Sequence, residues 1–135
     1  SLQNFPPEGN SLNWVVGHVV NARNRTLALA GQEAPLSEDR YAPYATGDDW
    51  GPSTAISFEA LLADFDRLQE PLKQALLSLS PEALAAPGTL SPTRPPTETV
   101  GSLLTGIVFH EAYHAGQMGL MRRLLGKPGA IGAPK

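Results

Sequence analysis

The sequence predicts an all-α protein built as an antiparallel helical bundle, and three observations indicate this class. Apolar residues recur at helical spacing in three long stretches, Leu12–Ala30, Phe58–Leu79 and Glu98–Leu125. Most of the 13 glycines and 13 prolines lie outside these stretches rather than inside them. Strands are hard to place anywhere. Because each helix must bury one face, the three stretches are expected to pack together in a single domain, residues 1–135.

The first stretch follows Ser11 or Asn10, either of which is a suitable N-cap, and it ends before Gly31, a natural C-terminal stop. Four valines lower its intrinsic helix propensity, so tertiary packing must hold it helical. A strand from Trp14 to Val20 is the alternative. The polar Asn-Ala-Arg-Asn-Arg run that comes next favours the helix.

The segment from Gly31 to Ser57 is expected to be irregular, because it holds Pro35, Pro43, Gly47, Gly51 and Pro52. A connection of this length in a compact domain is usually functional. It also carries three large aromatic residues: Tyr41, Tyr44 and Trp50. We therefore interpret this segment as one that packs on the bundle and covers part of it. A lid over the site is one role that such a segment can have.

The second stretch begins after Ser57, and Pro71 inside it is expected to kink or break the helix. Ser80, Pro81 and Glu82 then have the order typical of the start of a short helix, which ends at Pro87-Gly88. After a connector rich in proline and threonine, Thr97 is the predicted cap of the last helix. That helix stops at Gly126, with Pro128 beyond it.

Composition excludes several classes of protein. No apolar run approaches the roughly 18 residues that cross a bilayer, so no membrane partner is expected. The absence of cysteine excludes a disulfide framework, and the first ten residues show no export signal, so a cytoplasmic location is expected. The net charge is −3, and the small basic group of Arg122, Arg123 and Lys127 is explained by the helix dipole. Nucleic acid is therefore not an expected partner.

Two histidines mark the last predicted helix. His110 and His114 are four residues apart, which puts both imidazoles on one face, one turn apart. The rest of that face is apolar or amide: Leu103, Ile107, Gln117, Met121 and Leu125. This face must point into the bundle, where an unpaired polar ring is costly. Either each histidine hydrogen-bonds to a neighbour, or the pair shares a divalent metal ion with His18, the only other histidine.

The segment His110–His114 reads HEAYH and matches the H-E-x-x-H pattern of zinc peptidases, with Glu111 as candidate general base. Such peptidases usually take a further ligand from downstream, but no His, Asp or Glu follows His114. The third ligand must then be His18, and a peptidase is disfavoured. Glu111 is interpreted as a carboxylate behind the ligands or as a solvent-facing helix residue.

His18 follows Gly17, and a glycine inside a helix costs about 1 kcal/mol relative to alanine. Close approach of another element is a physical reason for it. Trp14, one turn before His18, is expected either to wall the site or to serve the core alone. Three neutral imidazoles leave a coordination position open, which is the pattern of catalytic zinc, and a larger open shell would suit nickel.

Two segments resemble the DinB/YfiT-like family of metal-dependent four-helix bundles: LNWVVGHV at Leu12–Val19, and HEAYHAGQ at His110–Gln117, followed by RRLLG. That family typically supplies one histidine from its second helix and an H-x-x-x-H pair from its fourth. The resemblance implies an up-down-down-up bundle and spans most of the chain. The family's first helix normally precedes the stretch equivalent to Phe5–Asn10, so this helix is expected to be missing or truncated here.

The resemblance also implies a function. Some relatives look like transferases that join a low-molecular-weight thiol, such as bacillithiol or mycothiol, to small electrophiles, and related bundles isomerise maleylpyruvate with a thiol cofactor. We therefore expect a metal-dependent S-transferase with a small-molecule substrate, and a homodimer. The alternatives are a hydrolase that uses metal-activated water, with Glu111 as base, and a non-catalytic metal-stabilised binding bundle.

Three further residues are candidates for the site. Asn21 and Arg25 follow His18 by about one and two turns and are candidates to orient an anionic thiol cofactor, although a surface role fits them equally. Gln117 is the candidate to hydrogen-bond a ligand or a metal-binding histidine.

Overall fold

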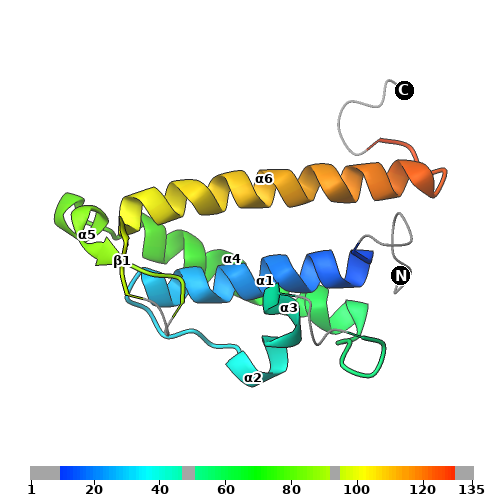
Figure 1. Cartoon of the computed structure of the whole chain (residues 1–135), viewed down its shortest axis with the longest axis horizontal. Coiled ribbons are helices and arrows are strands. Elements are labelled where there is room, and N and C mark those ends of the chain that lie inside the picture. Colours follow the sequence, from blue (N-terminus) through cyan, green and yellow to red (C-terminus); the bar gives the residue numbers. More distant parts are fainter. Residues whose placement is uncertain (1–9, 47–50, 92–94, 130–135) are drawn as a thin grey trace.

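Three long helices form the bundle in the computed structural model, which describes residues 10–46, 51–91 and 95–129. They are α1 (Leu12–Leu29), α4 (Phe58–Leu77) and α6 (Val100–Leu124). Helix α1 packs against both of the others, and Figure 1 shows α1 and α4 running in the same direction with α6 antiparallel to them. The all-α bundle is therefore confirmed, with the directions expected for the last three helices of an up-down-down-up arrangement.

Serine side chains begin the helices where the sequence predicts them. Each accepts a hydrogen bond from the backbone N–H three residues ahead, Ser11 at 3.1 Å, Ser57 at 3.3 Å and Ser80 at 3.2 Å. At the other ends, Gly31 and Gly126 have φ angles of 75° and 70°, a region that glycine enters without strain. Local sequence is thus enough to set these boundaries.

The start of the last helix was predicted too early. The short elements before it are α5 (Pro81–Ala85), β1 (Pro87–Gly88) and β2 (Glu98–Thr99). The two strands pair antiparallel, which holds residues 98 and 99 extended, so the helix begins only at Val100. The cap is accordingly Thr99, whose hydroxyl accepts a hydrogen bond from the N–H of Ser102 at 3.2 Å, and not Thr97.

Pro71 does not break α4, which continues from residue 58 to residue 77. Proline lacks the N–H that would bond to the carbonyl of Arg67. Both Pro71 and Arg67 are exposed, so water can reach the carbonyl that is left without its helical partner. Of the two outcomes predicted for Pro71, a kink or a break, the break is wrong, because the lost hydrogen bond lies on the solvent side.

The sequence analysis predicted that the connection between α1 and α4 is irregular. The connection instead contains two one-turn helices, α2 (Glu38–Tyr41) and α3 (Pro43–Thr46). Its Tyr41 and Tyr44 side chains are completely buried, which confirms a segment packed on the bundle. Trp50 lies outside the described residues.

Buried amides fasten this connection to α1. The Asn24 side chain donates to the carbonyl of Leu36 at 3.0 Å and accepts from its N–H at 3.1 Å. Nearer the start of α1, the amide of Asn13 donates to the carbonyl of Ile56 at 2.8 Å. Because buried amides must find partners, these bonds fix the path of the chain over α1.

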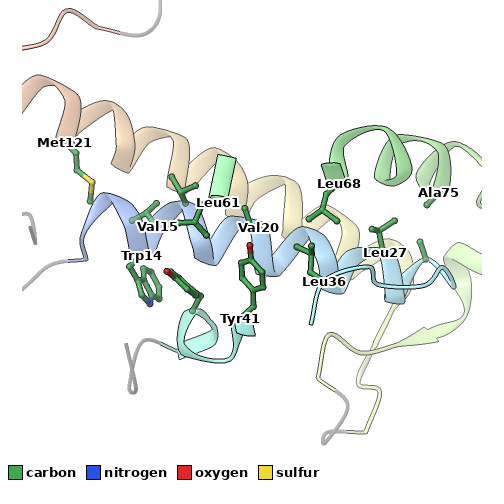
Figure 2. Packing of buried hydrophobic residues seen from close by; sticks show 13 residues of the cluster. Trp14, Val15, Val20, Leu27, Leu36, Tyr41, Leu61, Leu68, Ala75 and Met121 are labelled. Atoms are coloured by element: carbon green, nitrogen blue, oxygen red, sulfur yellow. The ribbon is translucent and has the colours of Figure 1, made fainter. Parts of the chain in front are cut away.

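The apolar core lies mainly along α1 and α4, as Figure 2 shows. The core residues labelled there are Trp14, Val15, Val20, Leu27, Leu36, Tyr41, Leu61, Leu68, Ala75 and Met121. Helix α6 buries little beyond Val100, His114 and Met121. Leu125, placed on the inward face by the sequence analysis, is 47% exposed because it lies just past the end of the helix.

Elsewhere on α6, large apolar side chains are exposed to solvent: Val108, Phe109, Tyr113, Leu120 and Leu124. Among the described residues, no helix combines the length and the hydrophobicity needed to cross a membrane.

Candidate metal centre

The fold brings the three histidines together at one point between α1 and α6. The Nε2 atom of His110 lies 2.9 Å from Nε2 of His18 and 3.1 Å from Nε2 of His114. One donor atom from each ring lies within 4.8 Å of the others, so the three could hold a metal ion. The residues that the sequence analysis singled out as ligands are therefore adjacent in space, although 92 positions separate His18 from His110.

Acceptor oxygens hold the outer nitrogens of two of these rings. Nδ1 of His18 is 2.6 Å from the backbone carbonyl oxygen of Tyr44, and Nδ1 of His114 is 2.9 Å from Oε1 of Gln117. A carbonyl oxygen can only accept, so each Nδ1 carries the proton and each Nε2 presents a lone pair. Gln117 thus orients His114, which is one of the two roles that the sequence suggested for it.

The donor set fits a metal ion. A proton on Nε2 of His110 can be directed well at the lone pair of only one neighbour, Nε2 of His18 or Nε2 of His114. The other neighbour then faces Nε2 of His110 with no proton between the two nitrogens. A cation at the centre interacts favourably with all three. Two nitrogen ligands of a tetrahedral zinc ion lie about 3.3 Å apart, close to the separations found here. Metal-ligating histidines also typically donate their other N–H to a carbonyl or carboxylate, as His18 and His114 do.

Trp14 forms a wall of the cluster. Its indole ring stacks on His18 with centroids 4.6 Å apart and planes 13° from parallel, and meets His114 edge-on at 6.5 Å. Two buried ring nitrogens of the centre, Nε1 of Trp14 and Nδ1 of His110, have no hydrogen-bond partner among the residues that the structure describes. Because the indole stacks on the His18 ring, it limits how far that ring can tilt.

Glu111 pairs with Arg23 of α1 and not with a histidine of the cluster. Its two carboxylate oxygens each accept a hydrogen bond from Arg23 at 2.8 Å, one from Nε and one from Nη2. The same guanidinium donates to Gln69 at 2.6 Å and lies 3.9 Å from the ring centroid of Phe65. Arg23 thus ties α6 to α1 and α4 beside His110. It was absent from the sequence predictions, since no local pattern connects two residues 88 positions apart.

Comparison with known proteins agrees with the helical-bundle fold and the histidine cluster. A family model described as DinB superfamily matches residues 2–118, which is most of the chain. The chain belongs to the DinB superfamily. Searches of curated proteins and of solved structures found no match.

In this DinB-superfamily chain, the two predicted cofactor contacts lie in different surroundings. Asn21 is buried on α1. Arg25 lines a separate cavity of about 150 Å³ together with Glu38 and Thr89. Its charge still reaches the histidines, since it contributes to lowering the pKa of His18. Their roles in cofactor binding stay predictions.

A larger cavity of about 440 Å³ is lined by residues of α1, α4 and α6. Aliphatic side chains from α4 and α6 supply most of its lining, namely Leu72, Leu76, Leu77, Leu104, Ile107 and Val108. The Arg23–Glu111 pair forms part of its wall, and the three histidines are not among its lining residues. The DinB-superfamily chain thus has an apolar cavity whose wall includes Glu111, the residue after His110, and which sequence patterns did not indicate.

Burial keeps two of the three histidines neutral. Desolvation is the main cause that lowers the pKa of His18, followed by repulsion from His114 and Arg25, with the Tyr44 hydrogen bond opposing. Desolvation also lowers the pKa of His110, with repulsion from His114 and His18 adding to it. Neutral imidazole is the form that binds metal, so this environment suits the proposed ligands.

These pKa shifts predict how the stability of the metal-free protein depends on pH. The unfolded chain binds protons at these histidines near pH 6.5, whereas the folded chain does not until lower pH. The free energy of unfolding should therefore be greatest above about pH 6.5 and fall as the pH drops through the lower, folded-state pKa values. Urea unfolding in excess chelator at pH 7.5 and pH 5.5 measures the difference.

A His110→Gln variant is the control for this prediction, because it removes one of the titrating groups and should show a smaller decline between the two pH values. Carboxylates contribute little in this window, since they titrate near pH 4. Equal stability of the wild-type protein at both pH values would contradict the prediction.

Proposed function

We propose that this DinB-superfamily protein is a metal-dependent enzyme that binds a divalent ion, zinc or nickel, through His18, His110 and His114. One observation carries the proposal: three Nε2 atoms meet at one point while carbonyl oxygens hold the outer nitrogens of two of the rings. Three protein ligands leave at least one coordination position for an exchangeable ligand, as catalytic sites require.

The reaction class that we propose is S-transfer from a low-molecular-weight thiol to a small electrophile. A divalent ion at such a site supplies Lewis acidity, which favours the ionised form of a thiol near neutral pH. Trp14 stacks on His18 and so closes one side of this point. The apolar cavity along Ile107 and Val108 is the right size for a small-molecule substrate, and its lining includes Glu111, the residue after His110. Arg25, whose charge contributes to lowering the pKa of His18, is the cation that we propose for an anionic thiol cofactor.

The decisive experiment replaces the metal with cobalt and adds thiol. We expect the Co²⁺-loaded protein to gain a sulfur-to-cobalt charge-transfer absorption on addition of bacillithiol or mycothiol. The S-methylated thiol, which cannot ionise, is the matched control and should produce no such band. Absence of the band with every thiol tested would contradict S-transfer and would leave hydrolysis and the non-catalytic bundle as the alternatives.

Hydrolysis by metal-activated water is the second candidate. An activity assay distinguishes it from S-transfer, because hydrolysis would not require added thiol. The position of Glu111 speaks against it, since a general base needs a free carboxylate oxygen and Arg23 occupies both. The homodimer and the cytoplasmic location stay predictions. The exposed apolar side chains of α6 are the surface that a second copy would cover.

A further inference from the structure

Tyr44 meets the proposed metal centre through its backbone. It lies on α3, which packs against α1, as Figure 1 shows. Its carbonyl oxygen lies 2.6 Å from Nδ1 of His18, and this bond sets which nitrogen of the ring is free to bind. A shift of this carbonyl would rotate the ring or change its tautomer. The position of the Tyr44 backbone therefore controls the direction in which Nε2 of His18 points.

The Tyr44 side chain fits against α1 at Gly17, next to His18. A Cβ atom built on Gly17 would lie only 2.2 Å from two ring carbons of Tyr44, far inside van der Waals contact. No other residue at position 17 leaves room for the ring where it is. The glycine inside α1, which costs helix stability, thus permits the close approach that the sequence analysis suggested for it.

The Tyr44 hydroxyl fixes the other end of the side chain. It donates to Oδ1 of Asn13 at 2.9 Å and accepts from the N–H of Ile56 at 2.8 Å. Asn13 in turn donates to the carbonyl of Ile56 at 2.8 Å, which closes a ring of three hydrogen bonds. Because the side chain is completely buried, every one of these groups would be costly to leave unpaired.

We propose that Tyr44 is a positioning residue of the metal centre. Its ring on Gly17 and its hydroxyl between Asn13 and Ile56 hold the backbone carbonyl that orients His18. The connection between α1 and α4 is accordingly a fixed part of the centre at this point and does not open as a lid here. This inference rests on the metal site proposed above and adds a residue to it that touches neither metal nor substrate.

Tyr44→Phe and Tyr41→Phe form a matched pair that tests this role. Both residues lie in the same connection, both are completely buried, and both lose one hydroxyl, which in Tyr41 donates to Asp64 at 2.6 Å. The affinity for Zn²⁺ is measured by competition with a chromogenic chelator, and the visible absorption spectrum of bound Co²⁺ reports ligand geometry. We expect Tyr44→Phe to weaken Zn²⁺ binding about tenfold and to shift the Co²⁺ spectrum. Tyr41→Phe should leave both unchanged.

A second pair approaches Tyr44 from the other side. Gly17→Ala forces the tyrosine ring to move, whereas Gly116→Ala places its new methyl group where no atom lies within 4 Å. Both are glycine-to-alanine changes within helices of the site, so helix propensity alone affects them in the same direction. Gly17→Ala should weaken Zn²⁺ binding and Gly116→Ala should not.

His18→Ala serves as the reference that separates the two proposals. If His18→Ala binds Zn²⁺ as well as the wild type, the three-histidine site itself is wrong. If His18→Ala loses Zn²⁺ while both tyrosine variants bind it equally well, or equally poorly, Tyr44 has no positioning role. Weaker binding and an altered Co²⁺ spectrum confined to Tyr44→Phe support the proposal.

Discussion

The His18→Ala variant is expected to be nearly metal-free, whereas the wild-type protein should carry close to one zinc or nickel ion per chain. His18 is the only donor that α1 brings to the cluster, so its loss leaves two histidines one turn apart on α6. Removing a hydrogen-bond partner behind a metal ligand typically costs 10- to 100-fold in affinity, so the loss of a ligand should cost more than about 100-fold. Mass spectrometry of tag-free protein measures the metal content.

Val19→Ala is the matched control for this variant. Val19 is the next residue of α1, is 4% exposed and offers no ligand atom, so its truncation disturbs the helix without touching the donor set. This control should retain its metal. If wild type and His18→Ala are both metal-free after reconstitution, or bind metal equally, His18 is not a ligand and the proposed enzyme loses its basis.

A second large effect is expected on stability. Leu61 is completely buried on α4 and belongs to the core shown in Figure 2. Leu61→Ala removes buried methyl groups and leaves a cavity, which should lower the free energy of unfolding by about 2–5 kcal/mol. Chemical denaturation of the metal-free protein measures it. The variant should still bind metal wherever it is folded, because Leu61 offers no ligand atom and the three histidines are unchanged.

Leu62→Ala is the control, since Leu62 follows on the same helix and is 45% exposed. The two variants share one chemical change and one helix propensity, and they differ in burial. We expect a loss well below that of Leu61→Ala. Similar losses for both would contradict the placement of the core between α1 and α4.

Local sequence was sufficient for most helix boundaries, because these depend on residues three or four positions apart. Ser11, Ser57 and Ser80 each cap a helix through the N–H three residues ahead. The predicted start of the last helix, with Thr97 as its cap, was wrong because pairing between β1 and β2 holds the chain extended there. The paired residues are ten and twelve positions apart, and no helical periodicity in the sequence reveals such a pairing.

The three candidate ligands could be chosen from sequence because histidine chemistry and helical spacing are local properties. His110 and His114 share a face through their separation alone, and His18 was the only histidine left to join them. Gly17 also signalled a close approach, although not which residue makes it.

Tertiary structure alone decided what surrounds these ligands. The carbonyl of Tyr44 that holds His18 is a backbone group, which every residue type possesses, so no pattern of side chains identifies it. The pairing of Glu111 with Arg23 joins two helices across 88 positions, and it turned a candidate base into a bridge between helices. The apolar cavity exists only because packing brings residues of α1, α4 and α6 around one space. The sequence determined which donors are available and the helices that carry them, whereas long-range packing decided where each ring points, because that depends on contacts between residues far apart along the chain.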